Sequence, residues 1–141
     1  MIRAYQSGDT ETVLAIWLAA SIKAHDFVAP SFWHSQVDKM RTQYLPNAET
    51  YVFQQEGEVV GFYSLDDKHI AAIFVEPNSQ GLGVGKQLIA HAKQQRSVLT
   101  LSVYKQNTAS YQFYLSQGFS LVKEQIDPHT GLPEYTMSTG I

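Results

Sequence analysis

The sequence has no cysteine, which excludes a disulfide framework, a thiolate metal site and a thiol nucleophile. Basic residues are not in excess either, because 13 acidic side chains stand against 10 basic ones and the formal net charge is −3. Nucleic-acid binding depends on a basic face, so we expect no nucleic-acid partner. The five histidines show no metal-ligand spacing, and we expect no metal.

Long apolar runs are also absent. No stretch approaches the roughly 18 apolar residues of a membrane-spanning helix, and no signal peptide precedes the first predicted strand. We therefore expect a cytoplasmic protein without a membrane partner. The length of 141 residues predicts one domain, residues 1–141, that folds as a monomer or a homodimer. Such a chain buries roughly 68% of the surface that it exposes when unfolded.

Hydrophobic periodicity predicts a mixed α/β fold, an α+β sheet with helices on its faces, in the order β-α-α-β-β-β-α-β-α-β-β. In the second helix, which runs from Pro30 to Asn47, a row of side chains is expected to lie on one face: Trp33, Val37, Met40 and Tyr44. Three strands joined by tight turns then form an antiparallel meander, at 51–55, 59–65 and 70–75. The last of them is a continuous apolar run, which predicts burial on both faces.

The second half of the chain alternates strands and helices. After a glycine-rich loop, a helix is predicted whose inner side carries Val84, Leu88, Ile89 and Ala92. The next strand, at 98–104, should run parallel to the last strand of the meander, because a strand–helix–strand unit makes a right-handed crossover. A helix at 108–117 and two final strands complete the predicted order.

The glycine-rich loop leaves a strand and opens a helix; it reads Gln80, Gly81, Leu82, Gly83, Val84, Gly85, Lys86. Backbone N–H groups at a helix N-terminus have no internal partner and lie at the positive end of the helix dipole. Glycines let a phosphate approach such a backbone closely. The loop therefore predicts a phosphorylated ligand, although a glycine-rich turn without a ligand would have the same composition.

Two well-known phosphate motifs do not match. The P-loop needs four residues between its glycines, whereas Gly81 and Gly85 are separated by three, and Gln87 stands where that motif has a hydroxyl residue. The dinucleotide-binding motif needs a third glycine five positions after the first, where this chain has Lys86.

A second segment, Asn107 to Phe119, resembles the N-x-x-A-x-x-F-Y-x-x-x-G-F signature of the GNAT superfamily of acetyl-CoA-dependent N-acetyltransferases. The glycine loop resembles the Q/R-x-x-G-x-G/A motif of the same family, and the V-x-P that commonly precedes it is matched at 75–77. Between Gly85 and Asn107 lie 21 residues, enough for a helix and a strand. The segments 25–27 and 133–137 resemble a branch of small, stand-alone bacterial members of the YjaB and YiaC type.

The resemblance implies an N-acetyltransferase that moves an acetyl group from acetyl-CoA to a primary amine. The acceptor is left open between a small amine, a peptide N-terminus and a protein lysine. Because no cysteine can carry the acetyl group, direct transfer in a ternary complex is the simplest route. The alternative is a non-catalytic module that binds or senses an acyl-CoA.

The resemblance also implies which residues act. Tyr114 would be the acid that protonates the leaving thiolate, and a backbone N–H around Phe74 or Val75 would stabilise the oxyanion. Asn107 would cap its helix and bind the pantetheine arm, and Ile73 would help to set the depth of the acyl pocket. The predicted coenzyme-binding set is Ile73, Phe74, Val75, Gln80, Gly81, Leu82, Gly83, Val84, Gly85, Lys86, Asn107 and Tyr114.

The general base is open, because the chain departs from the family pattern. Several members have a Glu that serves as base in the strand where this chain has Ser102. A serine cannot deprotonate an amine by itself. Glu76 is the first candidate, since it ends a strand close to the chemistry, and His25, His69 and direct loss of the proton to water are the alternatives.

Acceptor recognition is expected from the connection between the first two helices and from the turn at 128–133. There Asp26 can attract a cationic amine, next to His25, while Phe27, Trp33 and Tyr44 form an apolar wall. The other interpretation of Trp33 and Tyr44 is core packing of an amphipathic helix.

Overall fold

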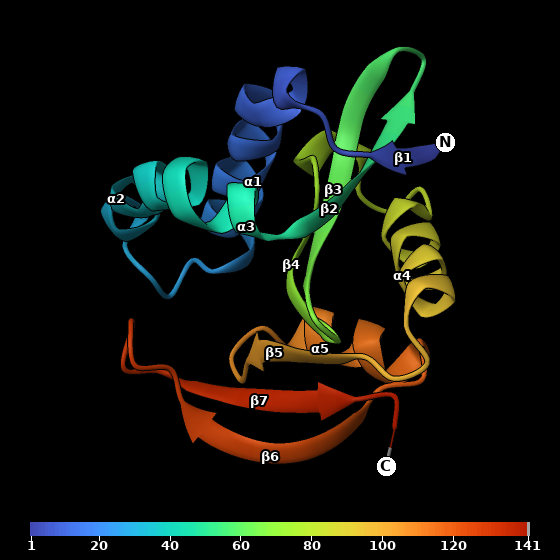
Figure 1. Cartoon of the computed structure of the whole chain (residues 1–141). Helices are drawn as coiled ribbons and strands as arrows, with labels where there is room; N and C mark the ends of the chain where they lie inside the picture. Colours follow the sequence, from blue (N-terminus) through green and yellow to red (C-terminus); the bar gives the residue numbers. More distant parts are fainter. Residues whose placement is uncertain (141) are drawn as a thin grey trace.

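The computed structural model describes residues 1–140 and contains one mixed sheet with helices on both faces (Figure 1). The strands are β1 (Ile2–Ala4), β2 (Glu49–Gln55), β3 (Glu58–Asp66), β4 (His69–Val75), β5 (Thr100–Tyr104), β6 (Ser120–Ile126) and β7 (Pro133–Ser138). The helices are α1 (Thr10–Ala24), α2 (Pro30–Lys39), α3 (Leu45–Asn47), α4 (Val84–Gln95) and α5 (Thr108–Ser116), with single turns at Ser7–Asp9, Met40–Tyr44 and Pro77–Ser79. No helix within residues 1–140 combines the length and the apolar character that a membrane crossing requires.

The seven strands follow the order β1-β2-β3-β4-β5-β7-β6, and the predicted α/β fold is confirmed. β2, β3 and β4 form the expected antiparallel meander. The turn between β2 and β3 uses Glu56 and Gly57 at φ values of 52° and 81°, both left-handed, as a two-residue hairpin of the I′ type requires. β4 and β5 are the parallel pair that the strand–helix–strand pattern predicts.

Each face of the sheet carries its own hydrophobic core. On one face, α4 inserts Val84, Leu88, Ile89 and Ala92, all nearly inaccessible, as their periodicity predicts. On the other face, α1 and α2 cover β2, β3 and β4 with a cluster that includes Val13, Trp17 and Trp33. α5 packs against β5 (Figure 1), and β6, whose residues are mostly exposed, forms the outer edge of the sheet.

One prediction about burial was wrong, and one row of side chains departs from the expected helix face. Of the apolar run at 70–75, only Ile70 is buried; Ala71 is exposed, and residues 72–75 are partly accessible. A continuous apolar run indicates an apolar environment, and here that environment is the wall of a cleft rather than a core. In the second helix, a π turn at Met40–Tyr44 shifts the register, so Trp33 and Met40 are buried but Tyr44 is 48% exposed.

Candidate active site

The centre of the sheet is opened by the divergence of β4 from β5. The two strands pair only at His69 with Thr100 and at Ile70 with Leu101, and beyond these positions they separate. The opening is a cleft of about 960 Å³ whose walls come from α1, β4, the glycine loop, β5 and α5. It takes in every residue of the predicted coenzyme-binding set except Leu82, which is 67% exposed and is not among the residues that line the cleft.

Strand pairing directs the backbone amides of β4 to opposite sides. The Glu76 amide donates to a carbonyl of β3 at 2.7 Å, and because successive residues of a strand alternate, the Phe74 amide also faces β3. The amides of Ile73 and Val75 then face the opening. The Gln80 side chain donates to the Val75 carbonyl at 3.1 Å from that same side. Of the two predicted oxyanion donors, Phe74 is therefore directed away from the cleft, and Ile73 joins Val75 as a candidate.

The three glycines of the loop have different structural roles. Gly81 and Gly83 have φ values of 80° and 83°, a left-handed conformation that other residues rarely adopt, and no atom lies within 4 Å of an added Cβ at either position. Gly83 is the N-cap of α4, so free helical amides lie next to this open space. A Cβ on Gly85 would instead lie 3.4 Å from the Phe113 ring. Two glycines thus leave room for a ligand, and the third lets α4 approach α5.

Lys23 reaches the glycine loop from the end of α1, a contact that the sequence analysis missed. Its ammonium group donates to the Gln80 side-chain oxygen at 3.2 Å, across 57 residues of sequence. Lys23 and Lys86 both line the cleft, and they are the cations closest to the loop in the lining set. A loop with free amides and two lysines suits a doubly charged phosphate group.

Tyr114 enters the cleft from α5. Its ring contacts Phe113 and Phe119, with ring centroids 5.5 and 5.8 Å away, and no hydrogen bond to its hydroxyl is found within residues 1–140. Burial raises the pKa of the Tyr114 phenol well above its ordinary value, so the group is protonated at neutral pH. The hydroxyl is therefore a free proton donor in the cleft.

Asn107 caps α5 and also orients His25. Its side-chain oxygen accepts the Ser110 amide at 3.2 Å, so its NH₂ group is the donor toward His25 Nε2 at 3.3 Å. Burial lowers the pKa of His25 to about 4, which keeps the imidazole neutral at pH 7. Because Nε2 accepts, the ring proton lies on the buried Nδ1.

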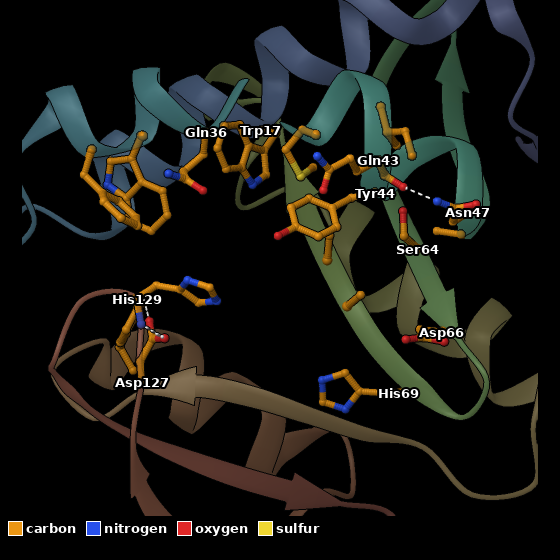
Figure 2. Close-up of a pocket in the computed structure, with 18 residues that line it drawn as sticks. Trp17, Gln36, Gln43, Tyr44, Asn47, Ser64, Asp66, His69, Asp127 and His129 are labelled. Atoms are coloured by element: carbon orange, nitrogen blue, oxygen red, sulfur yellow. Dashed lines mark hydrogen bonds between the residues drawn. The ribbon is translucent and has the colours of Figure 1, made fainter. Parts of the chain in front are cut away.

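A second pocket of about 820 Å³ adjoins the cleft on the side of α2 (Figure 2). The two cavities share Trp17, Trp33, Ala71, Ala72 and Tyr104, so they meet at the divergence of β4 and β5. Within the described residues, its lining contains two carboxylates, Asp66 and Asp127, and neither lysine nor arginine. This pocket is therefore suited to a positively charged group.

The remaining predicted acceptor residues are spread over different environments. Trp33 lines both cavities, and Tyr44 lines the second pocket (Figure 2). Phe27 packs edge-on against His25 and Tyr104, with centroids 5.7 and 5.6 Å away, and lines neither cavity. Asp26 is exposed and lies outside both linings. The acidic character of the second pocket thus comes from Asp66, the last residue of β3, and from Asp127, which follows β6.

The two other base candidates differ in position. Glu76 lies outside both linings, and its carboxylate accepts a hydrogen bond from Ser79 at 3.2 Å. His69 lines the second pocket, where its Nδ1 lies 2.8 Å from the Thr100 hydroxyl (Figure 2). Burial lowers the pKa of His69, and the charge of Asp66 partly opposes this shift.

A family model described as the acetyltransferase (GNAT) domain matches residues 19–139. The chain therefore belongs to the GNAT family and is an acyltransferase, which leaves the non-catalytic alternative without support. The peptidyl-lysine N-acetyltransferase YiaC of Escherichia coli (strain K12) is 33% identical over 98% of this chain and 95% of its own length. The predicted similarity to small members of the YjaB and YiaC type is confirmed.

Solved structures show the same fold. The solution structure of the apo form of YjaB from Escherichia coli matches with a TM-score of 0.87 and 29% identity, over 99% of this chain and 97% of that one. The PaiA N-acetyltransferase of Thermoplasma acidophilum, solved in complex with coenzyme A, matches with a TM-score of 0.82 over 98% and 96% of the two chains. At 14% identity, this second match concerns the fold alone.

Proposed function

We propose that this chain transfers the acetyl group of acetyl-CoA to the side-chain amine of a lysine in a peptide or protein, with both substrates bound at once. The observation that carries the proposal is the pair of cavities that meet where β4 leaves β5. One has a glycine loop and two lysines, which suit the diphosphate of the coenzyme. The other has two carboxylates and no cation among its described lining residues, which suits an ammonium group.

Each chemical role has a residue in the right cavity. The free amides of Ile73 and Val75 face the opening, where they can hold the thioester carbonyl and the amide groups of the pantetheine arm. Tyr114 supplies a proton to the sulfur as the carbon–sulfur bond breaks. Without a cysteine in the chain, the amine attacks the thioester directly. These residues fit the coenzyme by their chemistry: two cations, left-handed glycines and unpaired amides along one wall.

The lysine acceptor is supported by the second pocket and by one relative. A lysine side chain is a long apolar stem with a cationic end, and the pocket offers aromatic walls from Trp17, Trp33 and Tyr44 beside the carboxylates of Asp66 and Asp127. YiaC, which shares 33% identity with this chain, is named a peptidyl-lysine N-acetyltransferase. A free amino acid or a peptide N-terminus would place a less apolar group between these walls.

A thiol-release assay with acetyl-CoA tests the proposal. Three acceptors are compared: a peptide with one lysine and a blocked N-terminus, a peptide with a free N-terminus and no lysine, and a small polyamine. We expect thiol release with the first, and a mass gain of one acetyl group on the lysine side chain. Release with only the second or third acceptor would contradict the lysine assignment. No release with any of them would contradict the use of acetyl-CoA as acetyl donor.

A further inference from the structure

The strand that carries a Glu in several family members has Ser102 here, and Ser102 lines the cleft. Cross-strand neighbours of an antiparallel pair lie on the same face. On β7, Thr136 is opposite Ser102, and Glu134 is opposite Tyr104. Ser102 and Glu134 are therefore diagonal neighbours on one face of the sheet, a separation that a glutamate side chain can span.

Glu134 also lies at the level of the chemistry. The paired positions of β4 and β5 are His69 with Thr100 and Ile70 with Leu101. If the same pairing continued along both strands, Ile73 would lie opposite Tyr104, shifted by at most the one residue of the bulge in β4. On the other side of β5, Tyr104 is paired with Glu134. Among the described residues that line the cleft, Glu134 is the one with a carboxylate.

One hydrogen bond orients the Glu134 carboxylate and uses only one of its two oxygens. The Gln125 side-chain NH₂ donates to one carboxylate oxygen at 3.1 Å, which leaves the other oxygen available. The negative charge of Glu134 acts on both cavities, because it raises the pKa of His69 on β4 against the effect of burial and adds to the raised pKa of Tyr104. Glu134 thus lines the coenzyme cleft, and Tyr104, its cross-strand partner on β5, lines both cavities.

We propose that Glu134 is the general base, which takes the proton of the acceptor ammonium and so replaces the carboxylate that position 102 lacks. This role rests on the proposed function. The ammonium gives one proton to Glu134, directly or through one water, and Glu134 passes it to solvent. The neutral nitrogen then forms a bond to the thioester carbon as the carbon–sulfur bond breaks. The proton that the nitrogen loses on becoming an amide replaces the one that Tyr114 gives to sulfur.

The first test is Glu134→Gln, with Glu124→Gln as its matched control. Glu124 lies on the neighbouring strand β6 and pairs with Lys105 at 3.3 Å on the surface. We expect kcat/KM for the lysine peptide to fall by roughly 10²-fold in Glu134→Gln, the usual contribution of a positioned base, with the thermal shift on acetyl-CoA retained. Glu124→Gln should stay within twofold of the wild type. A loss below threefold in Glu134→Gln, beside an active wild type, would overturn the role.

The second test is restoration. The double variant Glu134→Gln/Ser102→Glu places a carboxylate on the same face of the sheet, at the diagonal neighbour of position 134. We expect its kcat/KM to be at least tenfold higher than that of Glu134→Gln alone. Glu134→Asp should also keep more activity than Glu134→Gln. If neither variant regains activity while both still bind acetyl-CoA, Glu134 serves the structure through Gln125 and is not the base. A wild type without thiol release would instead overturn the proposed function itself.

The third test is how the loss of kcat/KM in Glu134→Gln depends on pH. A lysine amine has a pKa near 10.4, so the need for a base fades as the pH approaches about 10. We expect the gap between wild type and Glu134→Gln to shrink at least tenfold between pH 7 and pH 10, whereas a structural defect would give the same gap at both. The ionisable groups around this carboxylate are Tyr104 on β5, His69 on β4, Asp127 after β6 and the Lys105–Glu124 pair, and all are unchanged in the variant.

Discussion

The Tyr114 hydroxyl is a proton donor whose pKa is raised by burial, which makes it a weaker acid than an ordinary phenol. A free thiol has a pKa near 8.5, so the transfer of its proton to a thiolate would be unfavourable in water. In the proposed reaction, however, the thiolate would be expelled beside the buried Tyr114 ring, where burial raises its basicity as well. The donor and the leaving group are thus shifted in the same direction, and the transfer is completed as charge develops on sulfur.

Tyr114→Phe removes only this hydroxyl and keeps the ring that contacts Phe113 and Phe119. We expect kcat to fall by roughly 10²–10⁴-fold, while KM for acetyl-CoA changes by only a few-fold, because the lost interaction belongs to the transition state. The control is Tyr111→Phe, one turn earlier on α5, whose ring packs on Tyr135 at 5.0 Å. Steady-state rates with the lysine peptide measure both, and equal kcat in wild type and Tyr114→Phe would overturn the acid assignment.

Among the elements, β3 and α4 meet at a glycine. A Cβ added to Gly61 would lie 3.1 Å from a methyl carbon of Val84 and 3.2 Å from the Phe74 carbonyl oxygen. The carbonyl belongs to the backbone of β4 and cannot move aside cheaply. The close approach of β3 to the first turn of α4 therefore requires glycine at this position.

Gly61→Ala is expected to destabilise the fold by about 1–3 kcal/mol, the usual cost of overpacking. Urea unfolding at neutral pH measures this loss. Gly8→Ala is the control, because no atom lies within 4 Å of its added Cβ and its φ is not left-handed, and it should leave the stability nearly unchanged. A Gly61→Ala variant as stable as the wild type would show that α4 can shift away from β3.

Most elements could be predicted from the sequence, because local patterns determine them. The period of Val84, Leu88 and Ile89 predicts α4 and its buried side, and the two family motifs predict the glycine loop and α5. The accessibility of β4 could not be predicted, because an apolar run has the same sequence pattern whether it lines a cleft or packs in a core. The sequence also gives no signal for the π turn at Met40–Tyr44.

The residues that the sequence analysis missed act across strands or helices. Lys23 meets Gln80 only because the end of α1 lies over the glycine loop, a contact between residues 57 positions apart. Glu134 comes beside Ser102 only through the register of β5 and β7. The Phe74 amide is excluded as an oxyanion donor by the side of β4 that pairs with β3. Such relations depend on register and packing, which composition and periodicity do not specify.

Within residues 1–140, the two cavities that the proposal assigns to the two substrates have largely separate linings. The glycine loop and Lys23 lie at one, and Asp66 and Asp127 lie at the other, while Trp17, Trp33 and Tyr104 border both cavities. The chain also has no cysteine to hold an acetyl group between two half-reactions. Both observations favour a complex in which both substrates are bound when the acetyl group moves.

Initial rates should therefore depend on both substrates in the manner of a ternary complex. When acetyl-CoA and the lysine peptide are varied together, double-reciprocal plots should intersect, because no product leaves before the second substrate binds. A coenzyme A analogue without the sulfur should compete with acetyl-CoA but not with the peptide, since the two enter by different cavities. Parallel lines, together with an acetylated enzyme that forms without acceptor and passes its acetyl group to added peptide, would contradict direct transfer and require a nucleophile within the chain.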